Sequence, residues 1–213
     1  MNKAASTRRE KGNERRRLIL SVTKDLLAQR PLEDISLAEI ASSAKIPVSS
    51  LYHFYPNILS VYSDLMLKFA DELGEHLLQD MASGEMTTAS PKSWQQLVNS
   101  GIESCAQFYQ LEPAYQQLVL SGKAPAQVKS TDREGDARLA QVFLSFMGQA
   151  FELPKIPNID AIFFNAIEVV DLFLSLDVMK NEQITASGVN EAKRACLSYL
   201  RSYLPDVLYH HSA

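Results

Sequence analysis

Residues 35–56 read ISLAEIASSAKIPVSSLYHFYP and carry the strongest structural signal in the chain. Ser36-Leu37-Ala38-Glu39 has the pattern of a capping box, in which the serine hydroxyl accepts a hydrogen bond from a free amide and the glutamate reaches back. A helix is therefore expected to begin after Ser36. Its inner face is predicted to consist of Leu37, Ile40, Ala41 and Ala44.

A tight turn and a second short helix are predicted to follow. Lys45-Ile46-Pro47 forms the turn, because proline is well tolerated at or beside the first position of a helix. Pro56 ends the second helix, and Leu51, Phe54 and Tyr55 are expected to pack inward from it. Two short helices joined in this way are typical of a helix-turn-helix that reads DNA.

Such a reader needs small or polar side chains where its second helix meets base edges, and hydrogen-bond donors for phosphates nearby. The first task suits Val48, Ser49 and Ser50, and the second suits Tyr52 and His53. Without this pattern, Tyr52 and His53 would be read as ordinary surface residues. The residues predicted to contact DNA are Arg15, Arg16, Ser36, Lys45, Pro47, Val48, Ser49, Ser50, Tyr52 and His53.

The charge distribution supports a polyanionic partner at one end of the chain. Residues 1–55 carry 10 Lys and Arg against 6 Asp and Glu, whereas the whole chain of 213 residues has a net charge of −4. Residues 1–12 are expected to form an irregular basic arm that neutralises phosphates or reaches a minor groove, before a helix from about Asn13 to Gln29. The alternative is that these basic residues are simply solvated and contact no partner.

The remainder indicates an all-α protein, since apolar residues recur at helical spacing and the breaks between helical segments contain proline or glycine. A polar loop is predicted at 83–92. The helices predicted after the reader are 58–82, 93–110, 113–121, 134–151, 158–180 and 187–204.

The last two of these helices indicate a homodimer. The helix at 158–180 is apolar on more than one side, so it needs two neighbours, one of which can be a second subunit. A fully internal helix is the alternative. The predicted dimer interface consists of Ile162, Ala166, Val170, Phe173, Ala192, Cys196, Tyr199, Leu200 and Tyr203.

Aromatic residues and methionine are frequent in the C-terminal part, where they form either a plain core or the wall of an apolar pocket with a few polar groups. The second alternative predicts a small lipophilic effector. The predicted pocket residues are Trp94, Cys105, Phe108, Tyr109, Tyr115, Gln116, Phe146, Asn165 and Glu168.

Several classes of protein are not favoured. Cys105 and Cys196 fit neither a disulfide framework nor a metal site, and no cofactor motif or local catalytic constellation occurs, so no cofactor and no enzymatic activity are expected. Acidic residues interrupt the most apolar stretch, 159–179, which argues against a membrane span. A cytoplasmic location without a membrane partner is expected.

The N-terminal segment resembles the TetR-type transcriptional regulators. The resemblance covers about 50 residues, and its most specific part is the run from Leu51 to Pro56; Ile19, Ala28, Ser36 and Ile40-Ala41 also match. It implies a three-helix DNA-binding domain at 1–57 and a larger helical domain at 58–213 that binds an effector and dimerises. The family pattern often has glycine where this chain has Lys45, and lysines where it has Val48 and Ile58.

The leading hypothesis is a dimeric repressor that binds a pseudo-palindromic double-stranded operator and leaves it when a small effector binds. A ligand-binding or protein-interaction module with a vestigial DNA reader is the alternative, motivated by the two absent lysines. Activation instead of repression would use the same DNA contacts.

Overall fold

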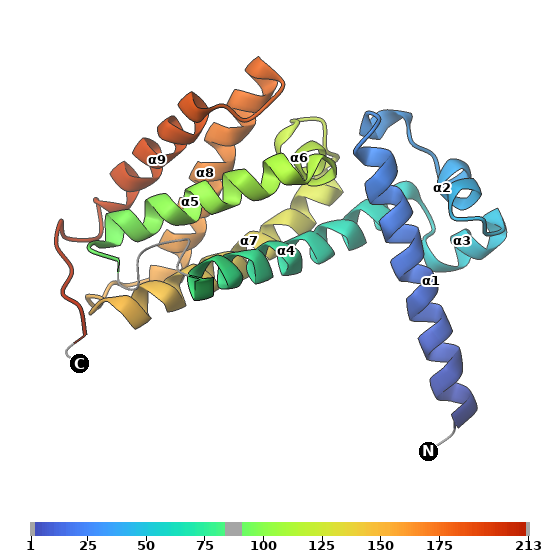
Figure 1. The fold of residues 1–213 in the computed structure, drawn as a ribbon, viewed down its shortest axis with the longest axis horizontal. Coiled ribbons are helices and arrows are strands. Elements are labelled where there is room, and N and C mark those ends of the chain that lie inside the picture. The colour runs from blue at the N-terminus through green and yellow to red at the C-terminus, as the bar shows by residue number, and fades with distance from the viewer. Residues whose placement is uncertain (1–2, 84–90, 212–213) are drawn as a thin grey trace.

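The computed structural model describes residues 3–83 and 91–211, which form an almost wholly helical chain, as predicted (Figure 1). The one β-contact among them is an isolated bridge between Phe151 and His210. The helices are α1 (Lys3–Leu27), the 3-10 helix η1 (Leu32–Asp34), α2 (Leu37–Ser43), α3 (Val48–Phe54), α4 (Ile58–Ser83), α5 (Trp94–Leu111), α6 (Pro113–Leu120), α7 (Ala126–Ala150), α8 (Ile159–Asn181) and α9 (Ala186–Leu200).

Most predicted helix boundaries agree with the structure to within two residues, but three do not. α1 begins at Lys3, so the predicted irregular arm is wrong, and α7 begins at Ala126 instead of residue 134. Both additional segments are rich in good helix formers but have little apolar periodicity, which explains why the pattern missed them. α9 ends at Leu200 and not at 204, because the chain tightens into turns before Pro205. The predicted loop at 83–92 lies mostly outside the described residues.

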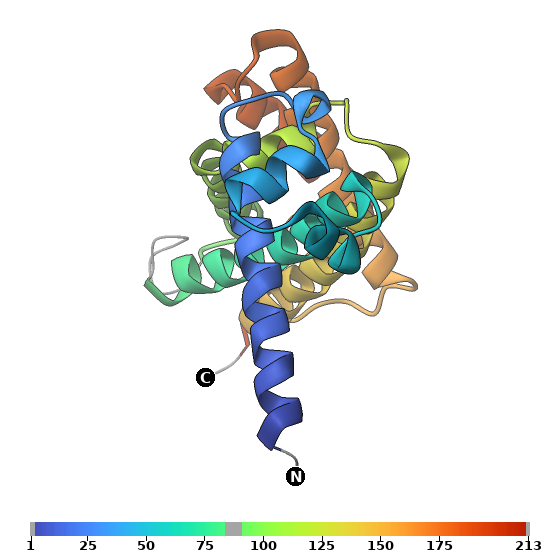
Figure 2. The ribbon, with the colours of Figure 1, turned by 90° about the vertical axis from the view of Figure 1, so that its right-hand side faces the viewer.

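The N-terminal helices form a small bundle around a shared apolar centre. Ile19 of α1, Ile40 and Ala41 of α2, and Leu51 of α3 are fully buried there. α1 also packs against α4 and α6, which joins the bundle to the rest of the molecule (Figure 1). The N-terminal half of α1 projects beyond the other helices in both views (Figures 1 and 2).

The larger part of the molecule is a stack of long helices in which α4 packs on α7, α7 on α8, and α8 on α9 (Figure 1). α5 contacts both α4 and α9 and so closes the bundle. Gly135 of α7 permits a close crossing, because an added Cβ would lie only 2.9 Å from Ala70 Cβ on α4. None of the helices, within the residues described, is long and apolar enough to cross a membrane.

Candidate DNA interface and effector cavity

The turn between α2 and α3 closes with a Schellman motif. The Ile46 amide donates to the Ala41 carbonyl at 3.0 Å, and the Lys45 amide donates to the Ser42 carbonyl at 3.1 Å. This geometry puts Lys45 in the left-handed region, with φ of 54°. Glycine is the usual residue at such a position because a side chain is strained there. The sequence places lysine at this point, exposed and beside the reading helix.

The N-terminus of α2 confirms half of the predicted capping box. The Ser36 hydroxyl accepts from the Glu39 amide at 3.3 Å. The Glu39 carboxylate, however, forms an ion pair with Arg30 instead of the predicted return bond to Ser36. Arg30 also donates to the Asp34 carbonyl at 2.7 Å. The glutamate therefore ties α2 to the segment that follows α1.

α3 has the exposed outer face and packed inner face that a recognition helix requires. Leu51 and Tyr55 are buried and Phe54 is half-buried, as predicted. On the outer face Val48 is 40% exposed and Tyr52 is 54% exposed. Of the ten residues predicted to contact DNA, Ser50 is half-buried and the rest are exposed. The DNA contacts themselves remain a prediction.

Two arginines of α1 contact the reading helix or its end. Arg15 Nη1 donates to Ser50 Oγ at 3.3 Å, and the Arg16 guanidinium lies 6.0 Å from the ring centroid of Tyr55. The Tyr55 hydroxyl donates to Asp64 Oδ2 at 2.7 Å, and burial, followed by this bond, raises the pKa of Tyr55. These contacts place two positive charges next to α3 and fix its orientation on α1 and α4.

Ile58, the other position where the family pattern has lysine, is the first residue of α4 and is half-buried against the apolar core. It therefore supplies no charge beside α3. The exposed cations nearest to the reader in sequence are Lys11, Arg15, Arg16 and Arg17 of α1, together with Lys45 in the turn.

A largely apolar cavity lies inside the larger helical part and encloses about 50 Å³. That space holds only a few water molecules, so an effector of drug-like size requires neighbouring side chains to move. The lining residues are Leu73, Leu77, Val98, Gly101, Ile102, Cys105, Tyr109, Asp136, Leu139, Phe143, Phe163, Ala166, Ile167, Val170, Asp171, Cys196 and Leu200.

Of the nine residues predicted for a pocket, Cys105 and Tyr109 line this cavity. Glu168 lines a separate, more polar hollow of about 170 Å³ between α7 and α8. Asn165 is exposed and donates to the Tyr199 hydroxyl at 3.0 Å. The other five lie outside the lining of the cavity: Trp94, Phe108, Tyr115, Gln116 and Phe146.

Three of those five residues have other partners. Trp94 is fully buried and its indole donates to the Pro205 carbonyl at 2.9 Å. Phe108 and Tyr115 stack in an aromatic cluster with Phe69. Sequence analysis missed Asp136 and Asp171, the two carboxylates in the cavity wall. Asp171 interrupts the apolar run of α8, which was the available signal.

The comparisons with known proteins identify the family. Residues 92–204, more than half of the chain, match the profile of the tetracyclin repressor-like C-terminal domain. Residues 19–62 match the profile of the bacterial regulatory proteins of the tetR family. The chain belongs to the TetR family. TetR-family regulators are DNA-binding proteins and not enzymes, so this chain is a DNA-binding transcriptional regulator.

Individual relatives agree with that assignment. The HTH-type transcriptional regulator EthR of Mycobacterium tuberculosis is 29% identical over 98 residues, which span 46% of this chain and 45% of EthR, about half of each. A TetR-family regulator from Streptomyces coelicolor superposes with a TM-score of 0.69 and 17% identity, over 89% of this chain and 99% of that one. FadR of Thermus thermophilus, a repressor solved with lauroyl-CoA, superposes with a TM-score of 0.60 and 15% identity. The match covers 87% of this chain and 94% of that one. The two superpositions show that the three proteins share a fold.

Most of the residues predicted for a dimer interface are buried inside the single chain of this TetR-family regulator. Six of the nine residues are buried in this way, so a second chain cannot cover them. They face the regulator's own core because α8 and α9 pack on each other and on α7 or α5. Phe173 and Tyr199 are half-buried and Tyr203 is exposed. The six buried residues are Ile162, Ala166, Val170, Ala192, Cys196 and Leu200.

A polar joint connects the TetR-family DNA-binding bundle to α6. The Gln117 carboxamide accepts from the Leu32 amide at 3.1 Å and donates to the Arg30 carbonyl at 2.9 Å and to the Leu27 carbonyl. Gln117 thus binds the C-terminal end of α1 and the start of η1 with one side chain.

Charged groups reinforce this joint. Lys24 of α1 forms ion pairs with Glu112 at 2.8 Å and with Glu72 of α4 at 3.5 Å. The Tyr115 hydroxyl of α6 donates to Glu72 Oε2 at 2.9 Å, and Lys24 Nζ lies 4.9 Å from the Tyr115 ring centroid. Three helices therefore meet in one hydrogen-bonded group.

Proposed function

We propose that this regulator is a homodimeric repressor that binds a pseudo-palindromic operator and is released by a small effector with an apolar body. The joint between Gln117 and the backbone at Arg30 and Leu32 carries this proposal, because it connects α6 directly to the DNA-binding bundle. α6 follows α5, whose Tyr109 lines the cavity. The N-terminal unit is proposed to end near residue 57, where α4 begins.

The proposed release follows from the size of the cavity. An effector larger than the present space separates α5 from α7 and α8, and α6 moves with α5. The joint then carries that displacement to α1 and changes the distance between the two recognition helices of a dimer. Linkage requires that DNA weaken effector binding by the same factor by which the effector weakens DNA binding.

The proposed dimer uses the outer faces of α8 and α9. Leu172 and Leu176 on α8 are 55% and 48% exposed, and Tyr203 follows α9 on the surface. Large apolar side chains on one helix face favour burial against a partner. A two-fold axis there would present two α3 helices to half-sites about 34–36 Å apart or a multiple of that distance.

The first experiment selects binding sites from a random DNA library and measures affinity by fluorescence anisotropy at several salt concentrations. The expected result is a two-fold symmetric site whose affinity falls steeply with salt. If Arg16 contacts a phosphate, the Arg16→Ala variant should reduce the slope of log affinity against log salt concentration by up to about 1. Selection of no symmetric site would contradict the proposal, and a reporter gene separates repression from activation.

A further inference from the structure

The effector cavity is apolar except at one place. Two carboxylates stand in its wall, Asp136 from α7 and Asp171 from α8. The same two residues also line the polar hollow of about 170 Å³ on the other side. They therefore separate an apolar chamber from a hollow that has Lys129 and Arg133 at its rim.

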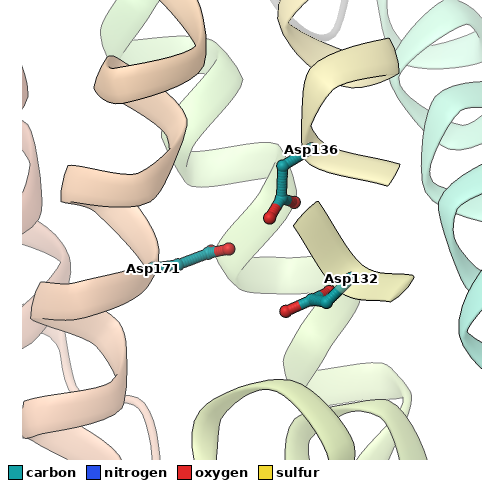
Figure 3. A group of neighbouring side chains, drawn as sticks. All are labelled: Asp132, Asp136 and Asp171. Atoms are coloured by element: carbon teal, nitrogen blue, oxygen red, sulfur yellow. The ribbon is translucent and has the colours of Figure 1, made fainter. Parts of the chain in front are cut away.

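The carboxylates form a cluster with Asp132, one helical turn before Asp136 (Figure 3). One oxygen atom from each of the three lies within 4.8 Å of the others. Figure 3 shows Asp171 extending from α8 toward the two aspartates of α7. Like charges at such distances repel strongly away from water, so the cluster favours a positive charge between them.

Asp136 points to a ligand independently of the cluster. Its side chain is only 5% exposed, and within residues 3–83 and 91–211 no hydrogen bond or ion pair reaches its carboxylate. A buried carboxyl group without a partner keeps its proton, and a cation placed beside it would replace that proton, which leaves to water. The available hydroxyl of Tyr109 lies 3.4 Å from Asp171 instead.

Among the residues that the structure describes, no positive side chain lines the apolar chamber. Its other titratable groups are Tyr109, Cys105 and Cys196; burial raises the pKa of each thiol to about 12, so both stay neutral at physiological pH. Arg133 pairs with Glu168 at 3.5 Å on the side of the polar hollow. An anionic effector would consequently add a negative charge beside two carboxylates and find no counter-charge in the chamber.

We propose that the effector is an organic cation, with an apolar body in the chamber and an ammonium group between Asp136 and Asp171. The inference rests on the proposed effector response and adds the chemical class of the ligand. A metal ion fits less well, because the apolar wall offers no further oxygen ligand except Tyr109 and because Lys129 and Arg133 occupy the polar side. The apolar lining instead provides the surface that an organic body needs.

The test measures binding of two matched sets of probes to the full chain by calorimetry. One set is hexylamine with the alcohol and the carboxylic acid of the same length, and the other is decylamine with its alcohol and acid. At least one amine should bind roughly tenfold more tightly than its alcohol, a difference of about 1.4 kcal/mol, because only the amine forms a charge-assisted bond. The acids should bind more weakly than the alcohols. Asp171→Asn and Asp136→Asn should each lose that preference for the amine, whereas Asp160→Asn, on the exposed side of α8, should keep it.

The inference is overturned if no amine binds better than the matching alcohol, or if both asparagine variants keep the preference while remaining helical by circular dichroism. Magnesium or manganese chloride alone, tested in parallel, would overturn it by binding the cluster and excluding the amine. Operator affinity with and without amine is a separate readout. An amine that binds through Asp171 but leaves operator affinity unchanged supports the cation site and counts against the proposed release mechanism.

Discussion

Gln117 Oε1 accepts a hydrogen bond from the backbone amide of Leu32 at 3.1 Å, and this bond joins the C-terminal helical domain of the regulator to its DNA-binding part. The same carboxamide donates to Arg30 and Leu27, so both of its ends are satisfied by the backbone around the end of α1. A side chain that meets three backbone groups restricts rotation of α1 relative to α6. Its removal should loosen the joint without touching DNA or the cavity.

Gln117→Leu is therefore expected to reduce the factor by which an effector weakens operator binding, from the wild-type value toward 1. It should also lower the free energy of unfolding by about 1–3 kcal/mol, because buried backbone groups lose their partners. Anisotropy with and without effector measures the first change and urea unfolding the second. Gln116→Leu, next to it but outside the cavity lining, is the matched control. Retention of the full coupling in Gln117→Leu would exclude this joint as the route.

Lys45 combines a strained backbone with an exposed positive charge, and two substitutions separate these properties. Lys45→Gly should relieve the left-handed conformation and stabilise the fold by up to about 1 kcal/mol, whereas Lys45→Ala keeps the strain. Both remove the charge, so both should reduce the salt dependence of operator binding by up to about 1 if Lys45 meets a phosphate. Thermal unfolding and salt titrations distinguish the effects. Equal stability of the two variants would contradict the strain at φ of 54°.

The outer face of α3 should divide into residues that read sequence and residues that position the helix. Val48→Ala and Ser49→Ala should change the preference among operator variants, with about 1–3 kcal/mol at one base pair. Tyr52→Ala should weaken all operators alike, with little change in salt dependence, because a hydroxyl contact displaces few ions. Binding to a panel of single-base operator variants measures both. A uniform loss in Val48→Ala and Ser49→Ala would remove their base-reading role.

The DNA-binding bundle could be predicted from the sequence because its signals are local. Ser36 caps α2 within three residues, Pro47 precedes α3, and Pro56 follows it, so each boundary depends on adjacent residues. The backbone before a proline is extended, which accounts for the end of α3 at Phe54. Turn strain at Lys45 was not predictable in the same way, since it depends on how Ile46 returns to the Ala41 carbonyl.

The cavity and the proposed dimer face depend on how the helices rotate against each other, which periodicity alone does not determine. Asp136 lies in a polar part of α7, and only packing against α8 turns it inward beside Asp171. α8 is apolar on two sides, and the sequence pattern could not tell which side faces the core. Ala166 and Val170 proved to be internal, while Leu172 and Leu176 are exposed.

The dimer face proposed on α8 gives a direct test of assembly. Leu176→Glu should dissociate the dimer, because it places a charge in the apolar centre of the proposed contact while remaining tolerable on the surface of a monomer. Operator affinity should fall at least tenfold, because one dimer has to occupy both half-sites at once. Leu111→Glu, at the exposed end of α5, is the control. Sedimentation of Leu176→Glu as an undisturbed dimer would show that α8 does not form the interface.

The carboxylate cluster should make stability depend on pH in an unusual direction. Burial, followed by Glu168, raises the pKa of Asp132 to about 7, and burial, followed by Asp171, raises the pKa of Asp136 to about 10. The folded state therefore holds protons that the unfolded chain releases above about pH 4. Unfolding free energy should consequently fall as pH rises through 7 and continue to fall toward 10.

Lys129 and Arg133 face the cluster and oppose this effect, and the hydrogen bond that Tyr109 donates to Asp171 opposes it too. Asp136→Asn removes a strongly shifted carboxyl group that lies beside both Asp132 and Asp171, so it should flatten the pH dependence. At pH 8 its free energy of unfolding should exceed that of the wild type by more than about 1.4 kcal/mol, the equivalent of one pKa unit. Urea unfolding between pH 5 and about 9 measures the profiles, with Asp160→Asn as the exposed control. A wild-type stability that rises over this range would contradict a buried, repelling cluster.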